Sequence, residues 1–202
     1  MKNELILLFL VFGSITSAQI INFPDANFKN ALVNTKCVDS DNNNSIDSDA
    51  DLNNDGEIDV SEAVKVNTLD IDSLSISSLA GIDNFKYLKH LDCSFNKLTS
   101  VDVQSLTNLV SLNCSSNQLT SLDIQSLTNL VSLYCSSNQL TSLNVQGLTN
   151  VITLSCGSNQ LTSLNVQGLT NLRFFYCSSN QLTSLNGQGL TNLINLDCSL
   201  CT

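Results

Sequence analysis

The sequence predicts an α/β solenoid, in which one short strand per turn stacks into a parallel sheet and a helical cap covers the N-terminal end. Six cysteines recur every 21 residues, and the apolar residues around them recur with the same period. A turn of that length cannot bury its own apolar face, so successive turns must stack around a common core. The residues before the repeats differ in composition, with a short helical pattern followed by a dense acidic run. The recurring cysteines are Cys93, Cys114, Cys135, Cys156, Cys177 and Cys198.

Residues 1–18 have the pattern of a secretory signal peptide. A lysine precedes an apolar run from Leu5 to Phe12, and two small residues, Thr16 and Ala18, precede Gln19. The run is much shorter than the roughly 20 apolar residues that a membrane span needs, so we expect no transmembrane anchor. The mature protein is therefore predicted to be secreted, extracellular or held at the cell surface.

Residues 19–38 are predicted to form the N-terminal cap. In the segment FPDANFKNALV, Phe28, Ala31 and Leu32 share one face of a helix, and the Pro-Asp pair before it suits a helix start. A stacked array leaves the core of its first turn open at the end. An amphipathic helix is the expected lid for that end.

Residues 39–62 form an acidic segment that holds nine of the 18 acidic residues and no lysine or arginine. Its second half, DLNNDGEIDVSE, fits the pattern D-x-[DN]-x-[DN]-G-x₅-E throughout. In such a loop side-chain oxygens, one backbone carbonyl and a bidentate closing glutamate surround Ca²⁺, and a glycine permits the sharp turn. The predicted ligands are Asp51, Asn53, Asp55, Glu57 through its carbonyl, Asp59 through water, and Glu62.

This loop resembles those of EF-hand and dockerin modules, which implies a structural calcium ion. The alternative is a disordered acidic linker. Just upstream, Asp39, Asp41 and Asn43 begin a similar pattern, but Asn44 stands where glycine is expected and Ala50 where the closing glutamate is expected. The segment is either a weak site or forms a shared second site with Asp47 and Asp49.

Residues 63–202 carry the repeats, one of which reads LVSLNCSSNQLTSLDIQSLTN from Leu109. Its pattern L-x-x-L-x-C-x-x-N-x-L resembles the leucine-rich repeat, with cysteine in an apolar slot. The alternation around Cys114 predicts a strand, and the rest of each turn is too short for a long helix, so irregular or 3₁₀ segments are expected there. We assign a degenerate first repeat to residues 66–87, regular repeats to 88–192 and a truncated repeat to 193–202.

The helix, the Asp/Asn loops and the repeats together resemble secreted bacterial leucine-rich repeat proteins of the internalin-like kind. That resemblance implies a non-catalytic recognition protein. Because the chain stops within a repeat unit, we expect a truncated form that lacks a closing lid or an anchoring segment.

Two polar columns of the repeats are predicted to be structural. An asparagine stands three residues after each of the first five ladder cysteines, where its amide can satisfy the turn backbones of adjacent coils. The stacked cysteine side chains have Cβ atoms about 4.8 Å apart, beyond the usual disulfide range, so we expect a reduced, apolar core column. The sequence does not decide whether Cys37 is free or paired, or whether Cys198 and Cys201 form a disulfide. The asparagines are Asn96, Asn117, Asn138, Asn159 and Asn180.

The residues flanking each inward leucine are predicted to face a partner on the concave wall. Half of these twelve residues are Ser, Thr or Asn. Aromatic residues and arginine are the usual anchors of interfaces, so we take the departures from this background as candidate ligand-binding residues. They are His90, Phe95, Tyr134, Arg173, Phe174 and Tyr176.

Composition narrows the function further. The formal net charge of −10 makes nucleic acid an unexpected partner. With one histidine and no nucleophile elbow, phosphate-binding glycine loop or zinc motif, we expect no enzyme. The favoured function is non-catalytic recognition of a protein or glycan, and the alternative is a structural or adhesive spacer. A third hypothesis is the ordering of water or ice by the column Thr99, Thr120, Thr141, Thr162 and Thr183.

Overall fold

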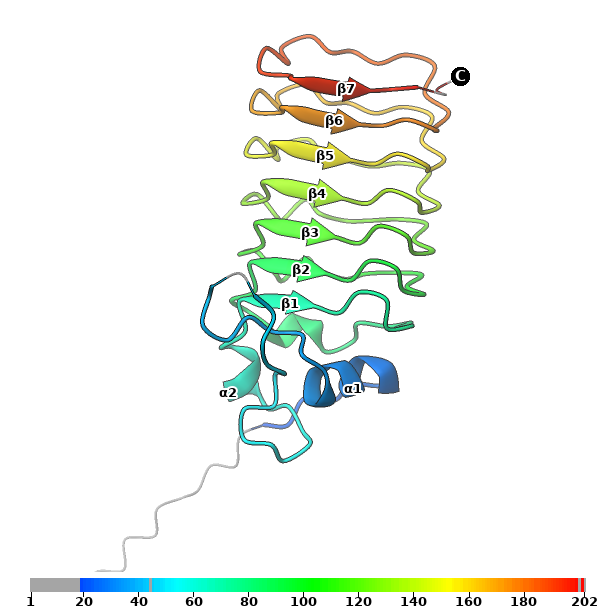
Figure 1. The fold of residues 1–202 in the computed structure, drawn as a ribbon. Helices are drawn as coiled ribbons and strands as arrows, with labels where there is room; N and C mark the ends of the chain where they lie inside the picture. The colour runs from blue at the N-terminus through cyan, green and yellow to red at the C-terminus, as the bar shows by residue number, and fades with distance from the viewer. Residues whose placement is uncertain (1–18, 44, 200, 202) are drawn as a thin grey trace, which may run out of the picture.

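The computed structural model describes residues 19–43, 45–199 and 201. The predicted signal peptide therefore lies outside the described residues, as does Asn44. The chain winds into a solenoid of stacked coils, with the N-terminal segment gathered at one end (Figure 1).

Each coil contributes one three-residue strand to a seven-stranded parallel sheet in which the strands follow chain order. From β2 onward every strand residue pairs with the residue 21 positions later, as Leu112 does with Leu133. The repeat length is therefore also the register of the sheet, and the predicted solenoid is confirmed. The strands are β1 (Thr68–Asp70), β2 (His90–Asp92), β3 (Ser111–Asn113), β4 (Ser132–Tyr134), β5 (Thr153–Ser155), β6 (Phe174–Tyr176) and β7 (Asn195–Asp197).

The middle residue of each strand points into the core, as Leu112 and Phe175 do. The opposite wall of the regular coils consists of turns with backbone hydrogen bonds such as those from Leu106 to Val103 and from Leu109 to Leu106. The degenerate first repeat has the short 3₁₀ helix η1 (Ile82–Asn84) at this wall. Short irregular or 3₁₀ segments were the expectation for this side of the coil, and the structure confirms it.

The cysteines and asparagines after the strands occupy the predicted columns. Cys93, Cys114, Cys135, Cys156 and Cys177 are fully buried. Asn138 is typical of its column: its Nδ2 donates to the carbonyls of Cys114 in the preceding coil and Cys135 in its own, at 3.0 and 3.2 Å, and its Oδ1 accepts from the Leu119 amide at 3.0 Å. Each asparagine therefore joins two coils, which confirms its predicted structural role.

The cap is built on α1 (Ala26–Asn34), whose buried face is Phe28, Ala31 and Leu32, as predicted. Asp25 caps this helix through Oδ1, while its Oδ2 accepts hydrogen bonds from Ser77 and Ser78 of the first repeat. One carboxylate thus fastens the lid to the array. A second helix, α2 (Val60–Ala63), follows the acidic segment.

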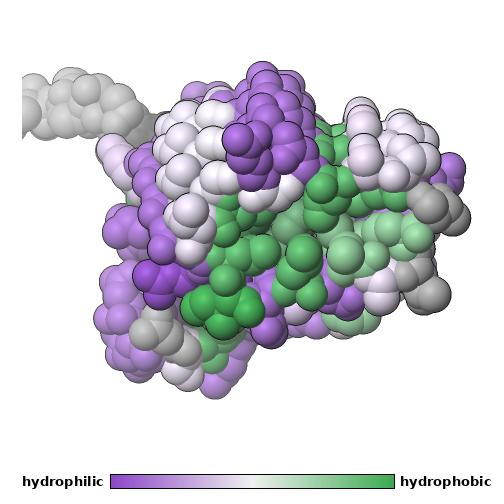
Figure 2. All heavy atoms as spheres, turned by 90° about the horizontal axis from the view of Figure 1, so that it is seen from above, coloured by the Kyte–Doolittle hydropathy of each residue, from purple (hydrophilic) through white to green (hydrophobic). Residues whose placement is uncertain are grey.

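The coil that carries β7 is more exposed to solvent than the coils before it. Leu196 is 49% exposed, whereas Leu112 at the equivalent position of β3 is fully buried. Figure 2 shows hydrophobic residues gathered across this end of the molecule. Cys198 is likewise exposed, unlike the five cysteines before it in the ladder.

Candidate calcium loop and recognition face

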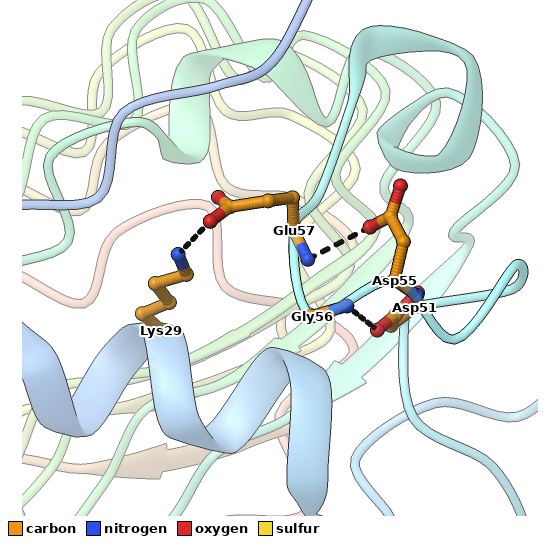
Figure 3. Close-up of polar contacts among 5 residues, drawn as sticks. All are labelled: Lys29, Asp51, Asp55, Gly56 and Glu57. Carbon is orange, nitrogen blue, oxygen red and sulfur yellow. Dashed lines mark hydrogen bonds and ion pairs between the residues drawn. The ribbon is translucent and has the colours of Figure 1, made fainter.

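The loop that begins at Asp51 is held in shape by its own predicted ligands. Asp51 accepts hydrogen bonds from the backbone amides of Asp55 at 3.1 Å and Gly56 at 2.8 Å (Figure 3). Asn53 and Asp55 each accept from the amide two residues later. Gly56 has a φ of 80°, a left-handed conformation that glycine adopts without strain. The predicted sharp turn is therefore present.

The loop closes at Glu62, the carboxylate at the start of α2. One oxygen of Glu62 accepts from the amides of Leu52 and Asn53, and the other accepts from the amide of Asp59 at 2.9 Å. Asp59 in turn caps α2, where hydrogen bonds from Ser61 and Glu62 lower the pKa of its carboxyl despite the opposing effect of desolvation. Glu62 is only 3% exposed, so this charge is held against the loop backbone.

The donor set suits a hard cation, because it consists of carboxylate, amide and carbonyl oxygens. The side chain of Glu57 turns away from the loop and forms a 2.7 Å ion pair with Lys29 of α1 (Figure 3), which agrees with a ligand role for its carbonyl alone. Within the described part of the chain, no group of three or more His, Cys, Asp or Glu side chains is arranged to hold a metal ion. The carboxylates instead hold backbone amides, and the calcium site stays a prediction.

The upstream acidic loop is tied to the sheet. Asp47 accepts from the amide and hydroxyl of Ser40, and these hydrogen bonds lower the pKa of its carboxyl. Val38 forms isolated bridges with Ser48 and with Leu69 of β1. This segment therefore lies beside the first strand, and its own calcium site likewise stays a prediction.

The outward residues of the strands form two columns on the sheet face. The register places His90 and Phe174 in the column of first strand residues, and Tyr134 and Tyr176 in the column of third strand residues. Tyr134 and Tyr176 are separated by Ser155, so their backbones are two strand spacings, about 10 Å, apart. The structure thus places four of the six predicted ligand-binding residues on the strand face.

The other two candidates lie at its margins. Arg173 immediately precedes β6 and is exposed, in the position that Val110, Val131 and Ile152 occupy in earlier coils. Phe95 lies in the turn after β2 and is 64% exposed. Its φ of 53° is left-handed, a conformation that is unfavourable for a bulky side chain. The corresponding residue of the next coils is a serine.

Sequence reasoning missed two sets of polar residues. Asp70 and Asp92 lie side by side in the column of third strand residues, and neither was a candidate because only His, aromatic and Arg residues were taken as departures from the polar background. A second asparagine column donates to backbone carbonyls of the preceding coil on the outer wall, and the recurring Thr-Asn pair was its signal. It consists of Asn108, Asn129, Asn150, Asn171 and Asn192.

Comparison with known proteins supports the leucine-rich repeat fold. Residues 107–148 match the family described as leucine-rich repeats in two copies. A leucine-rich repeat protein of Leptospira interrogans superposes with a TM-score of 0.60 and 30% identity, over 66% of this chain and 38% of that one. Internalin C2 of Listeria monocytogenes superposes with a TM-score of 0.53 and 20% identity, over 90% of this chain and 98% of that one.

The functional domain of InlJ from Listeria monocytogenes, described as including a cysteine ladder, matches with a TM-score of 0.47 and 26% identity over 90% of this chain. The chain spans 47% of that domain and 38% of the Leptospira protein. No curated protein matches the sequence significantly. None of the described helices has the length and apolar character that crossing a membrane requires.

Proposed function

We propose that this chain is a non-catalytic recognition module that binds a protein or glycan ligand through the strand face. The observation that carries the proposal is the interruption of otherwise small, polar columns by Tyr134, Phe174 and Tyr176. All three residues are half-buried, so each is partly covered by its neighbours and still leaves part of its surface accessible to a ligand. Supported aromatic rings contribute contact area at little cost in conformational entropy.

The size of the face indicates how a ligand would lie on it. Seven strands spaced about 4.8 Å apart, each three residues long, form a strip of roughly 300 Å². A stable protein interface covers about 800 Å² per partner. A protein ligand would therefore extend over the turns that follow the strands, where Phe95 is exposed.

The test compares two double variants on protein and glycan arrays. Tyr134→Ala with Tyr176→Ala removes both tyrosines of one column, whereas Ser111→Ala with Ser132→Ala changes the other column of the same face. We expect the tyrosine variant to lose at least tenfold in affinity for bound probes and the serine variant to lose less than twofold. Unchanged binding by the tyrosine variant would overturn the proposal.

A spacer function is the second candidate, because the column of first strand residues consists of Ser and Thr alone from Ser111 through Ser132 to Thr153. In that case binding would be weak, unaffected by the tyrosine substitutions and proportional to the number of repeats. Deleting residues 151–171, the complete repeat that contains β5 and lies between Tyr134 and Tyr176, separates the two functions. If the chain is a spacer, the deletion should reduce binding only in proportion to the lost length. If the strand face recognises a ligand, the deletion should abolish binding, because it changes the distance between the two tyrosine rings.

We also propose that the loop from Asp51 to Glu62 binds a structural Ca²⁺. Exported calcium modules bind at roughly 10⁻⁴ to 10⁻³ M, so 10 mM Ca²⁺ would add about 1.4 to 2.7 kcal/mol to the stability of the folded state. Thermal unfolding with and without Ca²⁺ measures this gain. Asp51→Asn should reduce it, and Asp197→Asn, at the far end of the array, should not. Equal gains in both variants would exclude this loop as the site.

The signal-peptide pattern of residues 1–18 supports an extracellular or surface location. We propose that the chain is exported and cleaved near Gln19. The mass of the protein recovered from the medium or the cell surface tests this, and retention of residues 1–18 in that protein would contradict it.

A further inference from the structure

A hollow of about 190 Å³ lies in the strand face at its N-terminal end, across β1 to β4. The residues that define its chemistry are Ile46, Asp70, His90, Asp92, Asn113 and Tyr134. Four of these occupy one column in consecutive coils, because the register runs from Asp70 through Asp92 and Asn113 to Tyr134. Ile46 belongs to the upstream acidic loop, so the cap segment contributes one wall.

The two carboxylates of the hollow are held in neighbouring strands. Asp92 is fixed by Asn113, whose Nδ2 donates to Oδ2 at 2.8 Å, and by Ser94, whose amide and hydroxyl donate to Oδ1 at 2.9 and 2.6 Å. Asp70 is half-buried, and desolvation together with the nearby charge of Asp92 raises the pKa of its carboxyl. Within the described residues, the one ion pair is that of Lys29 with Glu57 at the cap, so neither carboxylate of the hollow has a cationic partner.

We propose that this hollow binds the guanidinium or ammonium group of an arginine or lysine side chain from a protein ligand. The proposal rests on the recognition role of the strand face and names the chemistry of one of its sites. Asp70 and Asp92 supply acceptors for a charged head group, which binds carboxylates through strong hydrogen bonds. Tyr134 adds an aromatic ring that attracts cations. Ile46 offers apolar surface to the aliphatic stem of such a side chain.

A metal ion fits the hollow less well. A hard divalent cation takes six or more oxygen ligands, whereas the hollow offers two carboxylates together with a tyrosine and an asparagine whose amide is already directed at Asp92. Among the described residues no group of three or more acidic, His or Cys side chains is arranged for a metal. A volume of about 190 Å³ is also much larger than a bare ion requires.

The experiment titrates the isotope-labelled mature chain with N-acetyl-arginine methylamide and follows backbone amide signals by NMR. We expect saturable shifts at Asp70, Asp92 and Tyr134. The uncharged isostere N-acetyl-citrulline methylamide should bind at least tenfold more weakly, and N-acetyl-lysine methylamide should compete for the same signals. Titration with CaCl₂ and with neutral monosaccharides tests the other ligand classes at the same residues.

Two variants make the result specific. Asp70→Asn with Asp92→Asn should weaken arginine binding at least tenfold. Asp197→Asn is the matched control, because Asp197 lies in the same column and accepts from Ser199 as Asp92 does from Ser94. An unchanged amide spectrum elsewhere in each variant shows that the fold is retained.

The outcomes separate this inference from the function on which it rests. Shifts that do not saturate, equal binding of arginine and citrulline, or equal binding by the Asp70→Asn, Asp92→Asn variant would overturn the cation site. So would saturable shifts caused only by Ca²⁺ or by a sugar. If the tyrosine variant still loses array binding in that case, the recognition face stands without the cation site. If the tyrosine variant binds unchanged, the recognition face itself is wrong.

Discussion

Replacing Asn138 with alanine tests whether the asparagine column holds the coils together. Asn138 is 8% exposed and contacts four backbone groups of two coils, the amide of Leu119 and the carbonyls of Cys114, Cys135 and Ser136. The carbonyls of Cys114, Cys135 and Ser136 each keep a second hydrogen bond, from Asn117, from Asn159 and from the amide of Ser116 respectively. The amide of Leu119 has Asn138 Oδ1 as its acceptor and would be left without it.

The magnitude follows from these contacts. A buried donor without an acceptor costs about 1 to 3 kcal/mol, and each lost hydrogen bond to a carbonyl that keeps another partner costs about 0.5 to 1 kcal/mol. We therefore expect Asn138→Ala to lower the free energy of unfolding by about 3 kcal/mol. Asn138→Asp should be at least as damaging, because a carboxylate would face the three carbonyls that the amide now contacts.

The assay is urea unfolding followed by circular dichroism, with hydrogen exchange at the Leu119 amide as a local measure. Asn129→Ala is the control, since Asn129 is exposed and makes one hydrogen bond, to the carbonyl of Thr107 at 2.9 Å. That variant should lose less than about 1 kcal/mol. If the two alanine variants differ by less than about 1 kcal/mol, the buried amide is not the main link between coils.

Three further predictions follow from the buried thiols, the cap and the strained turn. Burial raises the pKa of Cys114 to about 12, so a bulky alkylating reagent should label exposed Cys198 in the native protein and the buried ladder only after unfolding, as counted by mass spectrometry. The pKa of Asp25 is lowered because hydrogen bonds from Ser77, Phe28 and Ser78 outweigh desolvation. The ionised carboxylate therefore stabilises the fold above about pH 4, and this stabilisation is lost as the pH falls through the lowered pKa. Asp25→Asn should therefore lower the melting temperature at pH 7 and change it less at pH 3. Phe95→Asn should leave the free energy of unfolding unchanged or raise it by up to about 1 kcal/mol, because asparagine tolerates a left-handed φ. A loss of stability in urea unfolding would show that the ring packs within the fold.

The repeated part of the fold could be predicted because one 21-residue unit sets its strand, its turn and its core, and stacking sets the rest. The alternation around Cys114 identified both the strand and its inward face, and the amide chemistry of Asn117 identified its partners. The cap helix could likewise be predicted from the shared face of Phe28, Ala31 and Leu32. In each case a local pattern decides the structure.

Two of the features that were missed depend on positions that the repeat does not define. Helix α2 escaped notice although Asp59 and Glu62 form a capping box, because the same residues were assigned to the calcium loop. The hollow at the N-terminal end depends on Ile46 reaching β1 from a loop outside the repeats. Only the folded chain brings that loop to the sheet.

The spacing of Tyr134 and Tyr176 keeps their rings from packing against each other on the strand face. Tyr134 in β4 and Tyr176 in β6 are separated by Ser155 in β5, so the two rings lie two coils apart in their column. On adjacent strands, about 4.8 Å apart, two rings would pack against each other and cover much of the surface that a ligand could use. With Ser155 between them, the backbones of the two tyrosines are about 10 Å apart, and neither ring has an aromatic neighbour on the adjacent strands of its column. The proposed recognition function makes use of this spacing, because a ligand can contact both rings fully only if they do not pack against each other.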